Sequence, residues 1–467
     1  MSNRLPSIIQ ANTRISRFLK SKNGFCNALN FISQTQLEPN DETYSILLKL
    51  CYNDRLFSES SALFSEISTP NIDHYNQLIR TAIRTQQNTS TIFSLLGKME
   101  QSGHTSSTAI LDELIAYNTR RRSLEGCLKL LHSFSNTSQL SIQSITNVVS
   151  LASQLASPRL AFEIAIEFES SSPRSLTVDT WLTILRSAAH HHYMPAIEHA
   201  WSIVVAENGT AVDEGTCILV LNACARTSNP QLSTLVIASL RNQFIPLQEH
   251  HLAPVIEAHA KADNIKEPFI LLGVMRQNKI APQLETAQPI LDVISKSVDS
   301  VDDAYYMLQD LQKEGEAIDI SALNVIISAS IKLGDIHRAL STFQEVDTFN
   351  LKPSTETYNI LLSGCIDTSN RSLGDKLLTL MKKQGIQPDK RTFERLIVLC
   401  LTQSTYEDAF YYLEEMKSVG YIPPQSVYET LIRRCKSLGD SRYKVALEEL
   451  CECQYKPSRS LMTFVNS

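Results

Sequence analysis

Glycine and proline are scarce in this 467-residue chain, at 14 and 17 residues. Both residues are common in the turns between strands, so their scarcity argues against a turn-rich sheet fold. The short apolar runs consist mostly of leucine, isoleucine and alanine, which favours helices. No apolar run reaches the ~18–20 residues that a membrane-spanning helix needs. We therefore expect an all-α protein with no membrane span.

Motifs that carry catalysis or bind metals are also absent from the sequence. It contains no C-x-x-C, H-E-x-x-H, G-x-S-x-G or glycine-rich phosphate loop. The histidine cluster at 190–192 cannot form a compact metal site alone, because consecutive residues of a helix point in different directions. We interpret it as a solvated turn. The sequence therefore predicts no enzymatic activity, no cofactor and no bound metal.

Acidic residues are missing from the start of the chain, where Glu38 is the first one. A basic segment without acids is typical of an organelle transit peptide, and we assign residues 1–25 to one, with a solvated first helix that caps the fold as the alternative. No apolar secretory signal occurs, so we expect the ten cysteines to be reduced thiols of an intracellular compartment. We expect the mitochondrial matrix, with the plastid as the alternative. The basic residues of the segment are Arg4, Arg14, Arg17, Lys20 and Lys22.

Proline recurs at a fixed interval towards the end of the chain. Intervals of 35, 35 and 34 residues separate Pro353, Pro388, Pro423 and Pro457. Within one period, "TYNILLSGCI" (357–366) and "LGDKLLTLMKKQG" (373–385) each carry apolar residues on one helical face, and Gly385 ends the second segment. A helix pair repeated at this interval predicts a solenoid, in which each pair is stable only when it stacks on its neighbours.

The repeat can be fitted along the chain as twelve copies, which gives the predicted domain layout. We expect a right-handed α-solenoid superhelix of about twelve helix-turn-helix repeats over residues 41–458, best matched at 320–458 and degenerate at 108–248. Residues 26–40 are expected to form a capping half-repeat, and residues 459–467 a short tail. The repeats are placed at residues 41, 72, 108, 142, 178, 214, 249, 284, 320, 355, 390 and 425.

One column of the repeat, its eleventh position, is cysteine, alanine or serine in nine of the twelve copies. A column of this kind indicates small side chains where helices pack closely. Copies one repeat apart lie roughly 9–10 Å from one another, too far for a disulfide or a shared metal ion. We therefore interpret these cysteines as core residues. An aromatic column is also interpreted as core, with base stacking as the alternative, and comprises Tyr44, Tyr75, Trp181, Tyr358, Phe393 and Tyr428.

The best copies combine the motifs T-Y-N-x-L-[IL], G-x-x-x-x-A and M-x-x-x-G-x-x-P-[DNS]. Thr357-Tyr358-Asn359 with Pro388-Asp389 is the best single copy. This pattern resembles the pentatricopeptide repeat family. The related tetratricopeptide repeat has a period of about 34 and a different signature, which the sequence disfavours. The resemblance implies an α-solenoid that binds single-stranded organellar RNA, messenger or ribosomal, in its concave groove.

In that family the fifth residue of each repeat and the last residue together contact one RNA base. An amide or hydroxyl at these places suits the Watson–Crick edge of an unpaired base. By this resemblance the RNA-binding pairs are Asn359 with Asp389 (uracil), Asn324 with Ser354 and Asn76 with Ser107 (pyrimidine, cytosine favoured), and Ser45 with Asn71 (purine, adenine favoured).

The remaining repeats depart from this pattern. Leu182, Ile218 and Ala253 cannot hydrogen-bond a base, and Glu394 and Glu429 would bring carboxylates near phosphates. The net charge of −6 argues against non-specific wrapping of nucleic acid, although it leaves room for a local basic stripe. The resemblance implies an RNA-binding protein that acts in transcript stability, processing or translation. The alternative is a protein-binding scaffold, such as a factor on the mitochondrial ribosome or a respiratory-complex assembly factor.

Overall fold

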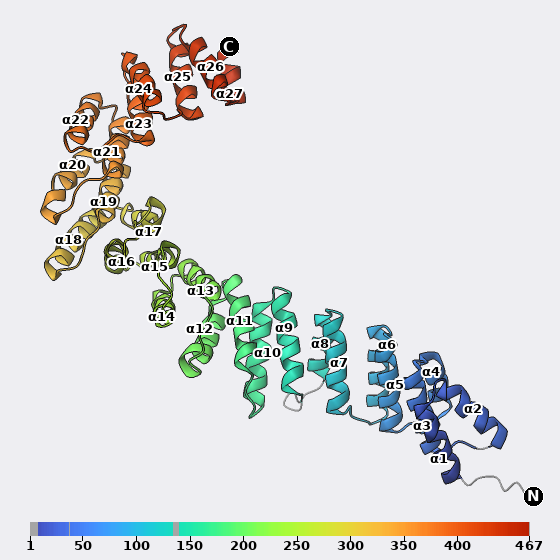
Figure 1. Cartoon of the computed structure of the whole chain (residues 1–467). Coiled ribbons are helices and arrows are strands. Elements are labelled where there is room, and N and C mark those ends of the chain that lie inside the picture. The colour runs from blue at the N-terminus through green and yellow to red at the C-terminus, as the bar shows by residue number, and fades with distance from the viewer. Residues whose placement is uncertain (1–7, 37, 134–139, 467) are drawn as a thin grey trace, which may run out of the picture. The chain divides into compact units, whose positions relative to one another are not determined.

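The computed structural model of the protein describes residues 8–36, 38–133 and 140–466, and every regular element within them is a helix (Figure 1). The helices come in pairs joined by short turns, and the pairs follow one another along the chain. The all-α solenoid expected from the sequence is confirmed. None of the described helices is both long enough and apolar enough to cross a bilayer.

The first helix of each of twelve pairs begins at the residue where the sequence places a repeat, and we number repeat positions from that residue. The first helices are α3 (Asp41–Asp54), α5 (Ile72–Arg84), α7 (Thr108–Arg120), α9 (Ile142–Gln154), α11 (Val178–His190), α13 (Glu214–Thr227), α15 (Glu249–Lys261), α17 (Leu284–Ile294), α19 (Ile320–Lys332), α21 (Thr355–Asp367), α23 (Lys390–Leu401) and α25 (Gln425–Ser437).

The second helices are more variable in length. They are α4 (Phe57–Glu66), α6 (Thr89–Gln101), α8 (Leu124–Ser133), α10 (Pro158–Ser171), α12 (Met194–Trp201), α14 (Pro230–Asn242), α16 (Lys266–Gln277), α18 (Val298–Glu314), α20 (Ile336–Gln344), α22 (Arg371–Lys383), α24 (Glu407–Ser418) and α26 (Tyr443–Glu452). A π-helical turn at Ser202–Glu207 continues α12, and short 3-10 turns lie at Phe18–Lys20 and Val346–Phe349.

The chain divides into two compact units, Met1–Thr210 and Ala211–Ser467. Within the first unit, the first helices α3, α5, α7, α9 and α11 pack side by side in chain order. Within the second unit, the first helices from α13 to α25 pack in the same way. Each second helix packs against the first helix of its own repeat. Each unit therefore has a surface formed by its first helices, which we call the first-helix face.

The repeat that begins with α21 shows why the sequence folds in this way. Ser354 caps α21, because its hydroxyl accepts the backbone N–H of Thr357 at 3.3 Å while the Thr357 hydroxyl accepts the backbone N–H of Ser354 at 3.0 Å. The fully buried Tyr358 donates its hydroxyl to Gln384 at 2.9 Å, which ties α21 to the end of α22. Gly385 then adopts a left-handed φ of 74°, and this conformation ends the repeat.

Both ends of the array contain more structure than the sequence predicted. The bounds predicted for the half-repeat, 26–40, are wrong, because α2 (Gly24–Thr35) is preceded by α1 (Ile8–Arg17) and both helices pack on α3. The tail predicted at 459–467 is wrong as well, because α27 (Arg459–Asn466) packs on α25 and buries Leu461. Residues 8–25 of the predicted transit segment thus belong to the array, whereas Arg4 lies outside the described residues.

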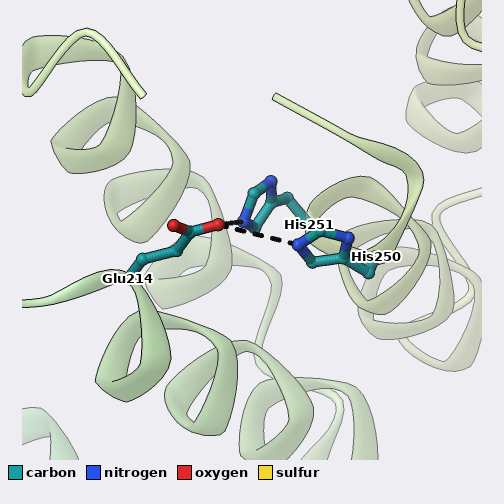
Figure 2. Close-up of side chains that lie close together, drawn as sticks. All are labelled: Glu214, His250 and His251. Carbon is teal, nitrogen blue, oxygen red and sulfur yellow. Dashed lines mark hydrogen bonds and ion pairs between the residues drawn. The ribbon is translucent and has the colours of Figure 1, made fainter. Parts of the chain in front are cut away.

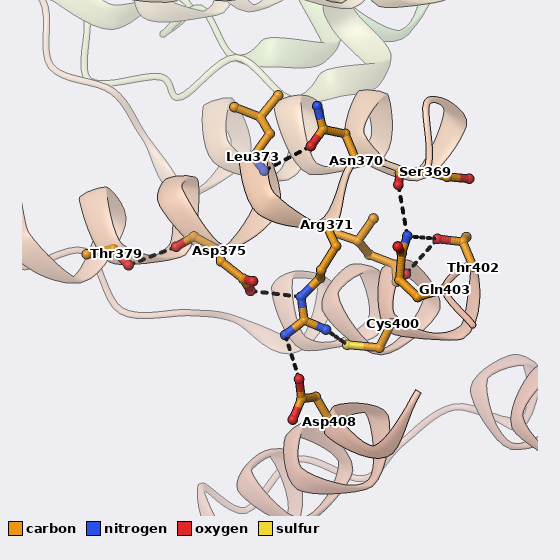
Figure 3. Close-up of polar contacts among 11 residues, drawn as sticks. Ser369, Asn370, Arg371, Leu373, Asp375, Thr379, Cys400, Thr402, Gln403 and Asp408 are labelled. Atoms are coloured by element: carbon orange, nitrogen blue, oxygen red, sulfur yellow. Dashed lines mark hydrogen bonds and ion pairs between the residues drawn. The ribbon is translucent and has the colours of Figure 1, made fainter. Parts of the chain in front are cut away.

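The cysteine column is confirmed as part of the core. Cys365 and Cys400 are fully buried, and burial raises the pKa of each thiol to about 12. Cys400 lies beside the guanidinium of Arg371, which also pairs with Asp375 and Asp408 (Figure 3). Arg371 thereby joins α22 to α23 and α24, but this cation does not offset the effect of burial on the thiol. The cysteines of this column are therefore packing groups rather than nucleophiles.

The aromatic column also lies in the core, so that stacking of bases on these rings receives no support. Five of its six rings are at most 4% exposed, and the sixth, Tyr44, is half-buried. The five buried rings are Tyr75, Trp181, Tyr358, Phe393 and Tyr428.

Candidate nucleic-acid interface

The last residue of a repeat is the residue that caps the first helix of the next repeat. This places it beside position 5 of the preceding first helix. In the best copy, Nδ2 of Asn359 on α21 donates to Oδ1 of Asp389, the cap of α23, at 3.1 Å. The structure therefore brings together the two members of this predicted pair.

The polar edge of Asn359 is occupied within the protein itself. The residue is fully buried, and its Oδ1 accepts the hydroxyl of Thr392 at 2.9 Å. Asp389 in turn accepts the backbone N–H of Thr392 at 2.7 Å. An RNA base can reach Asn359 only after part of this network opens, so its alanine variant would disturb packing as well as any base contact.

The other predicted pairs are arranged differently. Asn324 is 6% exposed and accepts the hydroxyl of Thr357 at 2.7 Å, and it lines a hollow of about 120 Å³ together with Ser354 and Arg276. Asn76 is half-buried, and its Oδ1 has no hydrogen-bond partner among the described residues.

Three further members of the predicted pairs make no hydrogen bond with their expected partners within the described residues. Ser107 precedes α7 and is exposed. Asn71 is occupied as the cap of α5, where it accepts the backbone N–H of His74 at 3.0 Å, and Ser45 is half-buried. Within the described residues, Asn359 with Asp389 is the one predicted pair joined by a hydrogen bond.

Position 3 of the repeat forms an inter-repeat contact, here called a latch, that was not predicted from the sequence. Its side chain hydrogen-bonds the position 5 side chain of the preceding repeat, so the two first helices are joined where they pack. Position 5 thus supports the stack in addition to any role in binding. The five latches are Thr43 to Asn12 (2.8 Å), Ser144 to Asp112 (2.6 Å), Thr180 to Thr146 (3.2 Å), Thr357 to Asn324 (2.7 Å) and Thr392 to Asn359 (2.9 Å).

At the repeat that begins with α15, position 3 is His251, which contacts position 1 of the preceding repeat, Glu214, and both belong to a cluster with metal-ligand character. Ligand atoms of Glu214, His250 and His251 lie within 4.8 Å of one another, and no other such group occurs in the described part of the chain (Figure 2). The backbone N–H of Gln248 donates to Nδ1 of His251 at 3.1 Å, so in the neutral ring Nε2 carries the proton and donates to Glu214 at 3.1 Å. Burial is the main cause that lowers the pKa of His251 and keeps the ring neutral.

A metal ion would need the Nε2 lone pair, which this tautomer of His251 does not offer. The cluster is therefore better explained as a helix cap and an inter-repeat contact. The histidines at 190–192 lie at the end of α11, where His190 and His191 are exposed, as expected for a solvated turn.

Exposed cations recur at position 13, near the end of the first helices. This row was not predicted from the sequence, although its spacing of about one repeat can be read there. Its three lysines form ion pairs with nearby carboxylates, at N–O distances of 2.5 to 3.8 Å, and such exposed pairs contribute little to stability. The row comprises Arg84 and Arg120 in the first unit, and Arg226, Lys261, Lys296 and Lys332 in the second.

In the first unit the row opens into a hollow of about 910 Å³ between α3, α5 and α7. Arg80 pairs with Glu113 at 2.9 Å, and the Arg84 guanidinium lies over the ring of Tyr52 at 4.5 Å. We call this site the arginine hollow, after Arg55, Arg80, Arg84, Arg120 and Arg121 in its lining. Arg55, Arg84 and Arg120 form no ion pair with any carboxylate that the structure describes, so their charges are available to an anionic ligand.

Two family models match the chain. One is described as a pentatricopeptide repeat-containing protein and matches residues 214–346, and the other is described as a pentatricopeptide repeat domain and matches residues 376–437. The chain belongs to the pentatricopeptide repeat family. A pentatricopeptide repeat-containing protein of Arabidopsis thaliana, named as mitochondrial, is 22% identical over 388 residues. That match covers 77% of this chain and 57% of the relative, so the chain spans less than two thirds of the relative's length.

Solved structures of helical repeat proteins are similar as well. The pentatricopeptide repeat protein PPR10 from maize, in complex with an 18-nt psaJ RNA element, is 16% identical with a TM-score of 0.38, over 98% of this chain and 77% of that one. Yeast Rmd9p, in complex with its 16-nt target RNA, is 12% identical with a TM-score of 0.39, over 96% of this chain and 95% of that one.

Two features of this pentatricopeptide repeat protein were thus not predicted from its sequence. In the best copies the latch residue is the threonine of the T-Y-N motif, for which no contact between repeats was predicted. The cation row can be read from the sequence as basic residues at one-repeat spacing. The net charge of the chain, −6, gives no indication of it. The latch contacts the predicted base-contacting position 5 directly, and the cation row lies eight residues further along the chain, near the end of each first helix.

Proposed function

We propose that this pentatricopeptide repeat protein binds single-stranded RNA along its first-helix face. By occupying RNA it would act in transcript stability, processing or translation. The observation that carries the proposal is the row of exposed cations at position 13, because lysine and arginine side chains at regular spacing suit a chain of phosphates. The array over residues 41–458 is proposed as the binding region.

The distance between the cation row and position 5 suits a nucleotide. Eight helical residues separate the two positions, which at 1.5 Å per residue is about 12 Å. A phosphate held by an arginine or lysine at position 13 therefore leaves its base pointing along the helix towards position 5. Unpaired bases are the part of RNA whose edges a protein can read in this way.

The proposed compartment is the mitochondrial matrix, with the plastid as the alternative. Its support is the basic, acid-free segment at residues 1–25 and the mitochondrial designation of the Arabidopsis relative. Residues 8–25 also contribute α1 to the array, where Asn12 Nδ2 donates to Glu42 at 2.9 Å. Removing this segment during import would therefore take away the contact of α1 with α3, while α2 would still pack on α3.

A second candidate function is a scaffold that binds protein, such as a component of the mitochondrial ribosome or of a respiratory complex. It is favoured by the apolar side chains at position 5 in the middle repeats. Leu182, Ile218 and Ala253 are half-buried there and offer no group that could hydrogen-bond a base. A protein ligand would use these positions as apolar contacts.

In vitro selection from a random single-stranded RNA library, with the full chain as bait, distinguishes the two functions. We expect enrichment of a short motif, bound in the nanomolar to micromolar range and weakened steeply by salt. A library that shows no enrichment, together with RNA affinity that does not change with salt, would exclude the RNA-binding function and leave the scaffold.

A further inference from the structure

A third hollow lies on the first-helix face of the second unit, between α23 and α25, with a volume of about 300 Å³. This is the lower end of the range for sites that hold small ligands. Its charged lining consists of two arginines and one glutamate, so the hollow carries net positive charge. The residues that matter for the argument are Arg391, Glu394, Arg395, Ser426 and Thr430.

Glu394 stands at position 5 of its repeat, where other repeats carry asparagine. Its carboxylate makes no hydrogen bond and no ion pair with any residue that the structure describes. The equivalent glutamate of the next repeat differs: Glu429 accepts the side chain of Gln425 at 2.8 Å and both the backbone N–H and the hydroxyl of Ser458, at 3.2 and 3.0 Å. Glu429 is therefore occupied by Ser458, whose hydroxyl accepts the backbone N–H of Leu461 in α27, whereas Glu394 is available.

Arg395 lies beside Glu394 and makes no hydrogen bond or salt bridge within the described structure, although the nearby carboxylates of Glu356 and Glu394 act on its charge. Burial is the main cause that lowers the pKa of its guanidinium, which means that the charge has lost water without gaining a hydrogen bond. Arg391 lies 3.9 Å from Glu356 and adds positive charge at the edge of the hollow. A ligand that fits must accept from a guanidinium and donate to a carboxylate.

The four RNA bases differ in how they meet a carboxylate. A carboxylate only accepts hydrogen bonds, so its two oxygens need two adjacent donors. Adenine and cytosine present an amino group next to an acceptor nitrogen, and uracil presents one N–H between two carbonyls. Guanine alone presents two neighbouring donors, N1–H and N2–H, with the acceptor O6 beside them.

We propose that the hollow between α23 and α25 receives an unpaired guanine. Glu394 accepts hydrogen bonds from N1–H and N2–H, and Arg395 donates to O6. Arg391 offsets the repulsion between the carboxylate and the RNA phosphates. This inference rests on the proposed RNA-binding function and assigns a base preference to the repeat at residues 390–424.

The test uses oligouridines that carry one central guanine, inosine, adenine or cytosine, with affinity measured by fluorescence anisotropy on the full chain. We expect guanine to bind about tenfold more tightly than inosine, which lacks the N2 amino group, and than cytosine. Glu394→Gln should remove this advantage and favour adenine, because an amide both donates and accepts. Glu429→Gln is the matched control and should leave the order of the four bases unchanged.

The two possible failures are distinguishable. If Glu394→Gln retains the guanine preference, or if the wild-type chain shows none, the guanine site is wrong while RNA binding stands. If none of the oligonucleotides binds, the RNA-binding function itself is wrong, and the guanine site falls with it.

Discussion

Replacing Arg55, Arg84 and Arg120 together with glutamine is expected to weaken the binding of single-stranded RNA about fifty-fold at 0.15 M salt. The three side chains face the arginine hollow and lack carboxylate partners among the described residues. Each phosphate contact on single-stranded RNA contributes about 0.7 to the slope of log K against log salt, so losing three should lower that slope by about 2. Filter binding or anisotropy between 0.05 and roughly 0.3 M salt measures both quantities.

A matched control keeps the change in charge and moves it to another surface. Arg159, Lys266 and Lys313 lie on second helices, away from the first-helix face. Their triple replacement by glutamine should change neither the affinity nor the salt slope beyond a small general effect of net charge. Equal losses in both triple variants would show that RNA is held by overall charge and not at the arginine hollow.

Replacing Gly273 with alanine is expected to destabilise the second unit by about 3 kcal/mol, through overpacking against a backbone that has little freedom to move. A Cβ atom at Gly273, in α16, would overlap the backbone oxygen of Ala317 in the turn that leads to α19. Urea unfolding followed by circular dichroism should show the loss. Hydrogen exchange should accelerate locally in α16 and α18, because repeat proteins depend on contacts between neighbours.

Gly97 in α6 provides the matched control for this substitution. It is also a glycine inside a second helix, but a Cβ atom there would meet no other atom within 4 Å. Gly97→Ala should therefore stabilise the protein by about 0.5–1 kcal/mol through helix propensity alone. If both variants are equally stable, the close approach of α16 to Ala317 does not contribute to packing.

The fold was largely predictable because its information is local and repeated. Each first helix begins at the residue where proline spacing and helical periodicity place a repeat, from Asp41 to Gln425. The ends were predicted less well, because α1 and α27 carry few of the repeat's signature residues and are recognised only by their packing on α3 and α25. The spacing of apolar residues shows which side of a helix is apolar, but it does not show which element packs against that side.

The candidate site was only partly predictable, since it depends on contacts across repeats. The sequence places Asn359 and Asp389 thirty residues apart, and the fold brings them within 3.1 Å. It could not show that Asn359 is buried and latched to Thr392, nor that Glu394 is available while Glu429 is occupied by Ser458. These differences arise from the distances between stacked helices, which no single repeat encodes.

Ultraviolet crosslinking of the full chain to the RNA enriched by selection, followed by mass spectrometry of the crosslinked peptides, tests the central claim most directly. Binding along the first-helix face predicts crosslinks in peptides from α5, α7, α19 and α23, which carry the cation row and the guanine site. Crosslinks confined to second helices such as α10, α14 and α22, or no crosslinks to the chain, would contradict it.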